Sequence, residues 1–209
     1  MIIKNFACKN IITKNEVKKF KNLVFKLASV KSLNNLKKFL ISIDNDTYHQ
    51  FRLKIINSFF FLKLNKVIKK RLEKKFNKKL FNFPVKGVRI ALADKKTHAP
   101  WHQDEGTWFH HKNLRNKNPF TIWIPIIASN ENTLEVSKSA LPLINHKRDK
   151  YKQAYIDAKN KWSKDTIIIK PHIGDGYIFS NFQPHRSICK KNTPSLRISI
   201  DFRFSESFV

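Results

Sequence analysis

The spacing of the apolar residues changes near residue 84, and this change constrains the fold more than any other feature. Before it, apolar residues recur mostly at steps of three and four, as Val17, Phe20 and Val24 do, which is the period of an amphipathic helix. After it, β-branched and aromatic residues alternate with polar ones in short runs that Pro, Asn or Asp interrupts, as in strands and turns. We therefore predict a helical N-terminal region over 1–84 and a β-rich core over 85–209, together forming one structural domain of α+β class.

Three helices are predicted in the first region. Asn15 can cap the first helix and Ser32 the second, because short polar side chains accept hydrogen bonds from the first turn. The Asp44-Asn45-Asp46 turn precedes a third helix, over about 47–80, whose far end is strongly basic. We interpret this basic end as a solvated helix face rather than a binding patch.

The strands predicted in the second region are short and closely spaced. No long alternation of strands and helices occurs, which disfavours a parallel Rossmann-like sheet and favours an antiparallel sandwich or jelly roll. Residues 145–165 carry aromatic and Ala residues at helical steps and predict an inserted helix. The predicted strands are 86–92, 101–104, 119–127, 132–136, 166–170, 176–180 and 196–204.

The net charge of +27 is the most unusual feature of the composition. So basic a chain could attract nucleic acid. However, Lys heavily outnumbers Arg, whereas phosphate-reading sites favour Arg, and the joint excess of Lys, Asn, Ile and Phe is typical of an AT-rich genome. We interpret most of the charge as compositional bias, although the Lys-rich helical region adds weight to a phosphorylated or otherwise acidic substrate.

The cysteines and the apolar runs bear on localisation. Cys8 and Cys189 are far apart and lack metal-binding spacing, so we expect reduced thiols in a cytoplasmic protein. No apolar run approaches the roughly 18 residues that a membrane span needs, and no signal-like segment begins the chain. These observations predict a cytoplasmic protein without a membrane span, and they leave the oligomeric state open.

His102, Asp104 and His185 have the residue types and the order of a metal-binding set. Alternate side chains of a strand project to one side, so His102 and Asp104 could reach one metal ion from one strand end. Two imidazoles and a carboxylate can hold one face of a ferrous ion and leave the opposite positions open, as in non-haem Fe(II) oxygenases. A lone His-x-Asp pair is weak evidence in a chain with 8 His and 15 acidic residues. The distant His185 and the downstream Arg197 strengthen it.

Taken together, several segments resemble the iron- and 2-oxoglutarate-dependent dioxygenases, and more narrowly the phytanoyl-CoA-dioxygenase-like group with its bacterial relatives of streptomycin and carbohydrate biosynthesis. The resemblance covers roughly residues 86–204. It implies a double-stranded β-helix, the cupin-like jelly roll, with the N-terminal helices packed on it. The segments that carry it are His102-Gln103-Asp104-Glu105, Thr121-Ile122-Trp123-Ile124-Pro125-Ile126, Asn132-Thr133-Leu134-Glu135-Val136, Gly174-Asp175-Gly176, His185 and Arg197-Ile198-Ser199-Ile200-Asp201-Phe202-Arg203.

The same resemblance implies an oxidative function. Fe(II), 2-oxoglutarate and O₂ would be the cofactor and co-substrates. A small metabolite, such as a sugar, a nucleotide-sugar or an antibiotic-type precursor, would be hydroxylated with release of succinate and CO₂. His102, Asp104 and His185 would be the catalytic metal ligands.

Arg197, Ser199 and Thr121 are the candidate 2-oxoglutarate-binding residues. A guanidinium can engage the distal carboxylate with two parallel hydrogen bonds, and Ser199 shares the strand face of Arg197. Arg203 shares that face too, and we prefer Arg197 because of its distance from His185 along the chain. The candidate substrate contacts are Trp123, Arg89 and His110.

Three alternatives remain at this stage. An oxidative demethylase of the alkylation-repair type shares His-x-Asp…His and an Arg-x₅-Arg pattern, which Arg197 and Arg203 reproduce, but Ser199 stands where those enzymes have Asn. A jelly-roll binding module without iron is disfavoured by the intact ligand set. A cupin-type isomerase or dioxygenase would usually present more His ligands and no Arg-x-Ser.

Overall fold

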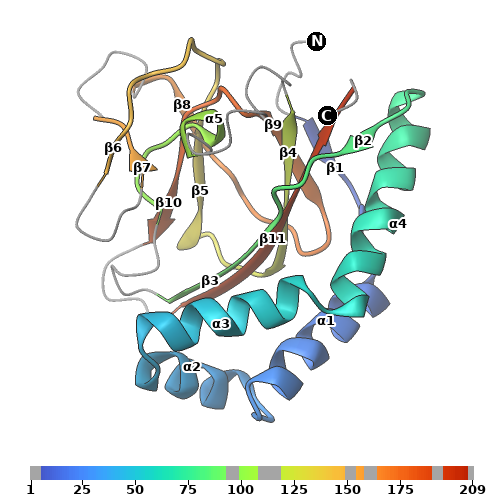
Figure 1. The fold of residues 1–209 in the computed structure, drawn as a ribbon, viewed down its shortest axis with the longest axis vertical. Coiled ribbons are helices and arrows are strands. Elements are labelled where there is room, and N and C mark those ends of the chain that lie inside the picture. Colours follow the sequence, from blue (N-terminus) through green and yellow to red (C-terminus); the bar gives the residue numbers. More distant parts are fainter. Residues whose placement is uncertain are drawn as a thin grey trace.

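The computed structural model describes residues 6–92, 99–107, 119–148, 154–157, 164–189 and 195–206. Figure 1 shows the N-terminal helices along the bottom and the right-hand side of a β-rich body, which contains two larger antiparallel sheets and a two-stranded one. A helical first region and a second region dominated by antiparallel strands agree with the predicted mixed fold class. Within the described residues, no helix is both long and apolar enough to cross a membrane.

Four helices follow the short strand β1 (Phe6–Cys8) in the N-terminal region: α1 (Lys14–Leu27), α2 (Leu33–Ser42), α3 (Asn45–Ile56) and α4 (Phe59–Phe76). Each begins after a side chain that accepts a hydrogen bond from the first turn, namely Thr13, Ser32, Asp44 and Ser58. Ser32 was predicted as a cap, whereas the expected cap Asn15 lies inside α1.

The single helix predicted over 47–80 is wrong, because the helix is interrupted at Asn57 and Ser58. Asn57 ends α3, and the Ser58 hydroxyl accepts a hydrogen bond from the backbone of Phe61. The basic end of α4 stops at Asn77, whose left-handed backbone conformation (φ 50°) is one that Asn tolerates.

The larger sheet has the order β1-β9-β4-β11-β2, and β3 also pairs with β11. Its strands are β1, β2 (Phe81–Asn82), β3 (Gly87–Leu92), β4 (Phe120–Ile127), β9 (Gly176–Ser180) and β11 (Leu196–Ser205). The smaller sheet has the order β10-β5-β8, from His185–Cys189, Asn132–Ser137 and Thr166–Ile168. All the pairings are antiparallel.

The two faces of β11 have different environments, and this positions the site. Ile198, Ile200, Phe202 and Phe204 are fully buried and belong to the core that includes the buried faces of the helices. The Phe61 ring of α4, for example, lies 4.8 Å from the Phe202 ring. A second apolar cluster joins the two sheets through Trp123, Phe179, Leu134, Val136 and Ile169. The polar face of β11 therefore points away from the helices, into the space between the sheets.

Two further predicted elements, both in the second region, differ from the structure. Residues 101–104 are not a strand, since His102 forms only an isolated bridge and Asp104 begins the short helix α5 (Asp104–Thr107). The predicted helix over 145–165 is wrong where it is described, because β6 (Lys147–Arg148) pairs with β7 (Ala154–Tyr155). The helical spacing there included Tyr151 and Trp162, which lie outside the described residues.

Candidate metal centre

His102 and His185 are joined through their backbones. The amide of each residue donates to the carbonyl of the other, at 3.0 and 2.9 Å, and the ring centroids lie 4.2 Å apart. This bridge connects the segment before α5 to the first residue of β10, so two residues far apart in sequence become neighbours. Although residues 101–104 do not form the predicted strand, the side chains of His102 and His185 lie close together as expected.

Nε2 of each histidine ring faces the Asp104 carboxylate, while Nδ1 faces a backbone carbonyl. Nδ1 of His102 lies 2.7 Å from the Pro100 carbonyl, and Nδ1 of His185 lies 3.0 Å from the Gln183 carbonyl. A carbonyl only accepts, so each Nδ1 carries the proton and each Nε2 keeps a lone pair. Both Nε2 atoms lie 3.9 Å from Oδ1 of Asp104.

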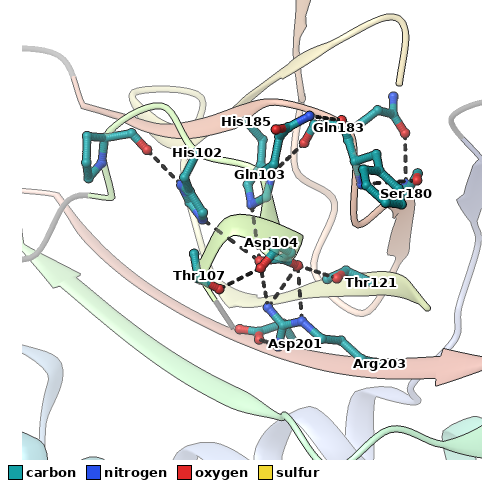
Figure 2. A network of polar contacts seen from close by, with 12 residues as sticks. His102, Gln103, Asp104, Thr107, Thr121, Ser180, Gln183, His185, Asp201 and Arg203 are labelled. Atoms are coloured by element: carbon teal, nitrogen blue, oxygen red, sulfur yellow. Dashed lines mark hydrogen bonds and ion pairs between the residues drawn. The ribbon is translucent and has the colours of Figure 1, made fainter. Parts of the chain in front are cut away.

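Asp104 completes a cluster in which the ligand atoms of the three residues all lie within 4.8 Å of one another. Figure 2 shows how the side chains of His102, Asp104 and His185 converge. Its carboxylate accepts hydrogen bonds from Arg203 at 2.9–3.1 Å and from the Thr121 hydroxyl. Burial alone would raise the pKa of Asp104, but the charge of Arg203 and its hydrogen bonds to the carboxylate hold that pKa well below its usual range. Asp104 is therefore ionised at neutral pH.

The histidines are neutral under the same conditions. Burial, and then the neighbouring His185, lowers the pKa of His102 to about 3, and burial likewise lowers the pKa of His185. Two neutral imidazoles and one buried carboxylate are the donor set that suits a divalent transition metal. The residues present fit Fe(II).

A cavity of about 280 Å³ opens beside these three residues. Arg197, Ser199 and Arg203 of β11 line it, together with Thr121 and Trp123 of β4 and Arg89 of β3. The candidate residues that the structure describes therefore all line one cavity. His110 lies outside the described residues.

Arg197 is fully buried at this cavity. Its guanidinium donates to the Thr133 carbonyl and to the Ser187 hydroxyl, and lies 5.9 Å from the Trp123 ring. Nε of Arg197 and Oγ of Ser199 are buried without a hydrogen-bond partner among the described residues. Burial lowers the pKa of Arg197 to about 9, so the side chain is still mostly cationic at neutral pH.

The buried side-chain amide of Gln103 holds the segment next to His102 in place. The Gln103 side chain donates to the carbonyls of Leu141, Pro142 and Phe182 and accepts from the amide of Ile144. These contacts give the Gln103 side chain a structural role. Sequence reasoning missed Ser187 and the Thr133 carbonyl as partners of Arg197, because the packing of the two sheets creates these contacts.

Solved structures share this architecture. EvdO2 from Micromonospora carbonacea var. aurantiaca, complexed with 2-oxoglutarate, is 12% identical, with a TM-score of 0.58 over 97% of this chain and 86% of its own. The non-heme alpha ketoglutarate dependent epimerase SnoN from nogalamycin biosynthesis is 12% identical, with a TM-score of 0.61 over 97% and 76% of the two chains. The chain has the fold of these proteins.

EctD from S. alaskensis, solved with 2-oxoglutarate and 5-hydroxyectoine, shares the fold as well. It is 13% identical, with a TM-score of 0.62 over 97% of this chain and 72% of its own. No family model and no curated protein matches the sequence. At these identities the likeness concerns the fold, and the chemistry has to be argued from the site.

Proposed function

We propose that this protein is an Fe(II)- and 2-oxoglutarate-dependent oxygenase that hydroxylates a small metabolite. The observation that carries the proposal is the convergence of His102, Asp104 and His185 in a cavity that also contains Arg197 and Ser199. The shared fold supports it, since the similar structures include proteins complexed with 2-oxoglutarate. We assign the two facing sheets to the double-stranded β-helix on the same basis.

In this proposal, Nε2 of both histidines and a carboxylate oxygen of Asp104 hold Fe(II). Bound iron would supply the O₂ chemistry that couples oxidation of 2-oxoglutarate to succinate and CO₂ with oxidation of the substrate. Arg203 and Thr121 hold the Asp104 carboxylate in place through hydrogen bonds. Partners of this kind fix the orientation of a ligand before the metal binds.

Arg197 and Ser199 are the proposed binding site for the distal carboxylate of 2-oxoglutarate. Nε of Arg197 and the Ser199 hydroxyl can each donate a hydrogen bond, and the guanidinium supplies the positive charge. Arg203 is less suited to this task because it is hydrogen bonded to Asp104 and Asp201. The Thr121 hydroxyl would help to orient the Asp104 carboxylate rather than contact 2-oxoglutarate.

The substrate contacts are proposed from the cavity lining. Trp123 offers an apolar surface and Arg89 a charged one. The names of two similar structures include nogalamycin and 5-hydroxyectoine, and both are small molecules. A sugar, a nucleotide-sugar or an antibiotic-type precursor is the class that we propose.

Succinate formation tests this function. The purified protein would be incubated with Fe(II), 2-oxoglutarate and O₂, alone and with pools of sugars, nucleotide-sugars and amino-acid derivatives. We expect succinate release that Asp104→Ala abolishes and that Glu131→Ala, the loss of an exposed carboxylate outside the cavity, leaves unchanged. Equal turnover in the wild type and the Asp104→Ala protein would remove Asp104 from the metal centre.

A further inference from the structure

The cavity beside the metal centre has more positive than negative side chains. Of the described residues that line it, five are cationic, namely Arg52, Lys86, Arg89, Arg197 and Arg203, and two carry carboxylates, Asp104 and Asp201. Whichever cations these carboxylates pair with, three positive charges are in excess among the described lining residues. The proposed cofactors do not change this excess, because the two charges of Fe(II) are balanced by the two carboxylates of 2-oxoglutarate.

The excess charge gathers on the side of β11 opposite to β4. Arg89 lies on β3, directly across from Ser199 of β11, while β4 pairs with the other edge of β11. Arg197 instead reaches Thr133 and Ser187 of the smaller sheet. The cavity therefore has a second cationic region beside β3, separate from the contacts of Arg197.

Helix α3 fixes one member of this region. The Tyr48 hydroxyl donates to the Ile90 carbonyl at 2.8 Å, and Nε of Arg52 donates to the Val88 carbonyl at 2.5 Å. These hydrogen bonds occupy two carbonyls of β3 that would otherwise be open to another strand. They also hold the Arg52 guanidinium over the Tyr48 ring, 5.6 Å from its centroid, where it lines the cavity.

The cations are close enough to repel one another. The pKa of Arg89 is lowered, first by burial and then by the charge of Arg52. The pKa of Arg197 is lowered by burial and then by the charge of Arg89. Placing several guanidinium groups at a cavity has an energetic cost, which a bound anion would relieve.

Asp201 is unable to neutralise this region by itself. One of its carboxylate oxygens accepts from Arg203 at 2.7 Å. A Cβ atom on Gly87 would lie 2.6 Å from that same carboxylate, so the glycine makes room for it. Asp201 is therefore held at the Arg203 end of the cavity, two residue pairs along the strands from Arg89.

We infer that the substrate carries an oxyanion group, a phosphate or a carboxylate, which Arg89 binds together with Arg52 and Lys86 on the β3 side of the cavity. This inference rests on the proposed function, since it takes the cavity to be the active site. Guanidinium groups match the geometry of both oxyanions. The substrate class is thereby narrowed to acidic metabolites, such as sugar phosphates, nucleotide-sugars or carboxylated precursors.

Calorimetric titration with simple anions tests the inference without knowledge of the substrate. Inorganic phosphate and acetate would be titrated in separate experiments into the protein loaded anaerobically with Fe(II) and saturating 2-oxoglutarate, and into the metal-free protein. We expect at least one of them to bind without loss of the visible absorption of the chelate. Preference for phosphate would indicate a phosphorylated substrate, and preference for acetate a carboxylated one.

Variants locate the anion. Arg89→Gln should weaken anion binding about tenfold, because a partly buried cation contributes strongly to holding an oxyanion. Lys86 lies in the loop between β2 and β3. Lys86→Gln should therefore weaken anion binding less than Arg89→Gln and leave the sheet unchanged. Lys54→Gln removes the same charge from an exposed position of α3 and should have no effect.

Three results would overturn the inference: no anion binding to either form of the wild type, equal binding to wild type, Arg89→Gln and Lys86→Gln, or binding that displaces 2-oxoglutarate. Failure of the proposed function looks different. In that case the chelate absorption never forms, while the titration of the metal-free protein still decides whether the cationic region binds an anion.

Discussion

Arg197 and Arg203 lie on one face of β11 but have different partners, and this difference separates two tasks. Arg203 donates to both carboxylate oxygens of Asp104, whereas Arg197 contacts a backbone carbonyl and Ser187. We therefore propose that Arg203 orients the metal ligand Asp104 and that Arg197 binds the co-substrate. Each of these two roles can be tested with a separate Arg→Lys variant.

Arg203→Lys keeps the charge but loses the planar donor pair. We expect Fe(II) affinity to fall about tenfold or more, since a partner that orients a metal ligand contributes about that much. Anaerobic Fe(II) titration of the purified variant measures this. Unchanged affinity would show that Asp104 does not depend on Arg203 for its orientation.

Arg197→Lys should spare the metal and affect 2-oxoglutarate. Loss of a buried, charge-assisted donor costs about 2 kcal/mol or more, which is roughly 30-fold in affinity. We expect the dissociation constant for 2-oxoglutarate to rise by about that factor while Fe(II) affinity stays the same. If Arg203→Lys raised this constant and Arg197→Lys did not, the assignment of the two arginines would be reversed.

The residues of the candidate metal site were predictable because their chemical types and order are specific. The alternation of β11 also placed Arg197, Ser199, Asp201 and Arg203 on one face. Their separate partners were not predictable, because the partners come from β5, β10 and α5, whose packing is set by the whole fold. Arg52 was missed for the same reason, since only the packing of α3 against β3 brings it to the cavity.

The contact between helices α1 and α4 depends on a charged side chain, Glu16, and can be tested through it. Glu16 closes a capping box with Thr13 and also accepts two hydrogen bonds from Arg71 of α4. Burial would raise the pKa of Glu16, but the hydrogen bonds from Arg71 and Thr13 lower that pKa below its ordinary value of 4.5. A lowered carboxyl pKa stabilises the folded state above the ordinary value, and the contribution disappears as the pH falls through the lowered one.

Glu16→Gln should therefore reduce the free energy of unfolding by about 0.5–1 kcal/mol at neutral pH, because it loses the charge that faces Arg71 but keeps a capping side chain. Urea unfolding at pH 7 and at pH values below 4.5 measures the difference, which should shrink in acid. Glu131→Gln, at an exposed site, is the control. A difference independent of pH would mean that the Glu16 charge does not stabilise the fold.

The strands with a clear apolar face were predictable from alternation, whereas the polar strand β10 was not. β3, β4, β5, β8, β9 and β11 lie within or close to the predicted ranges, because each has a clear apolar face. β10 was missed because His185, Arg186 and Ser187 are polar, and these are the residues that the site uses. The division of the chain at residue 84 remains a prediction, although β1 extends the N-terminal region into the larger sheet.

At the scale of the whole molecule, the charge of +27 makes one expectation about nucleic acid testable. We expect only non-specific DNA binding, with an affinity that falls steeply between low and physiological salt, as for any basic surface. Fluorescence anisotropy with duplexes that contain or lack an alkylated base would measure this. A clear preference for the alkylated duplex at physiological salt would instead favour the demethylase alternative.

The central claim is that His102, Asp104 and His185 form an iron site that accepts 2-oxoglutarate. Anaerobic addition of Fe(II) and then 2-oxoglutarate, followed by visible absorption, tests it most directly. The account predicts a weak charge-transfer band that appears only with both additions and is lost in Asp104→Ala. The absence of any band in the folded wild-type protein, or an equal band in Asp104→Ala, would contradict it.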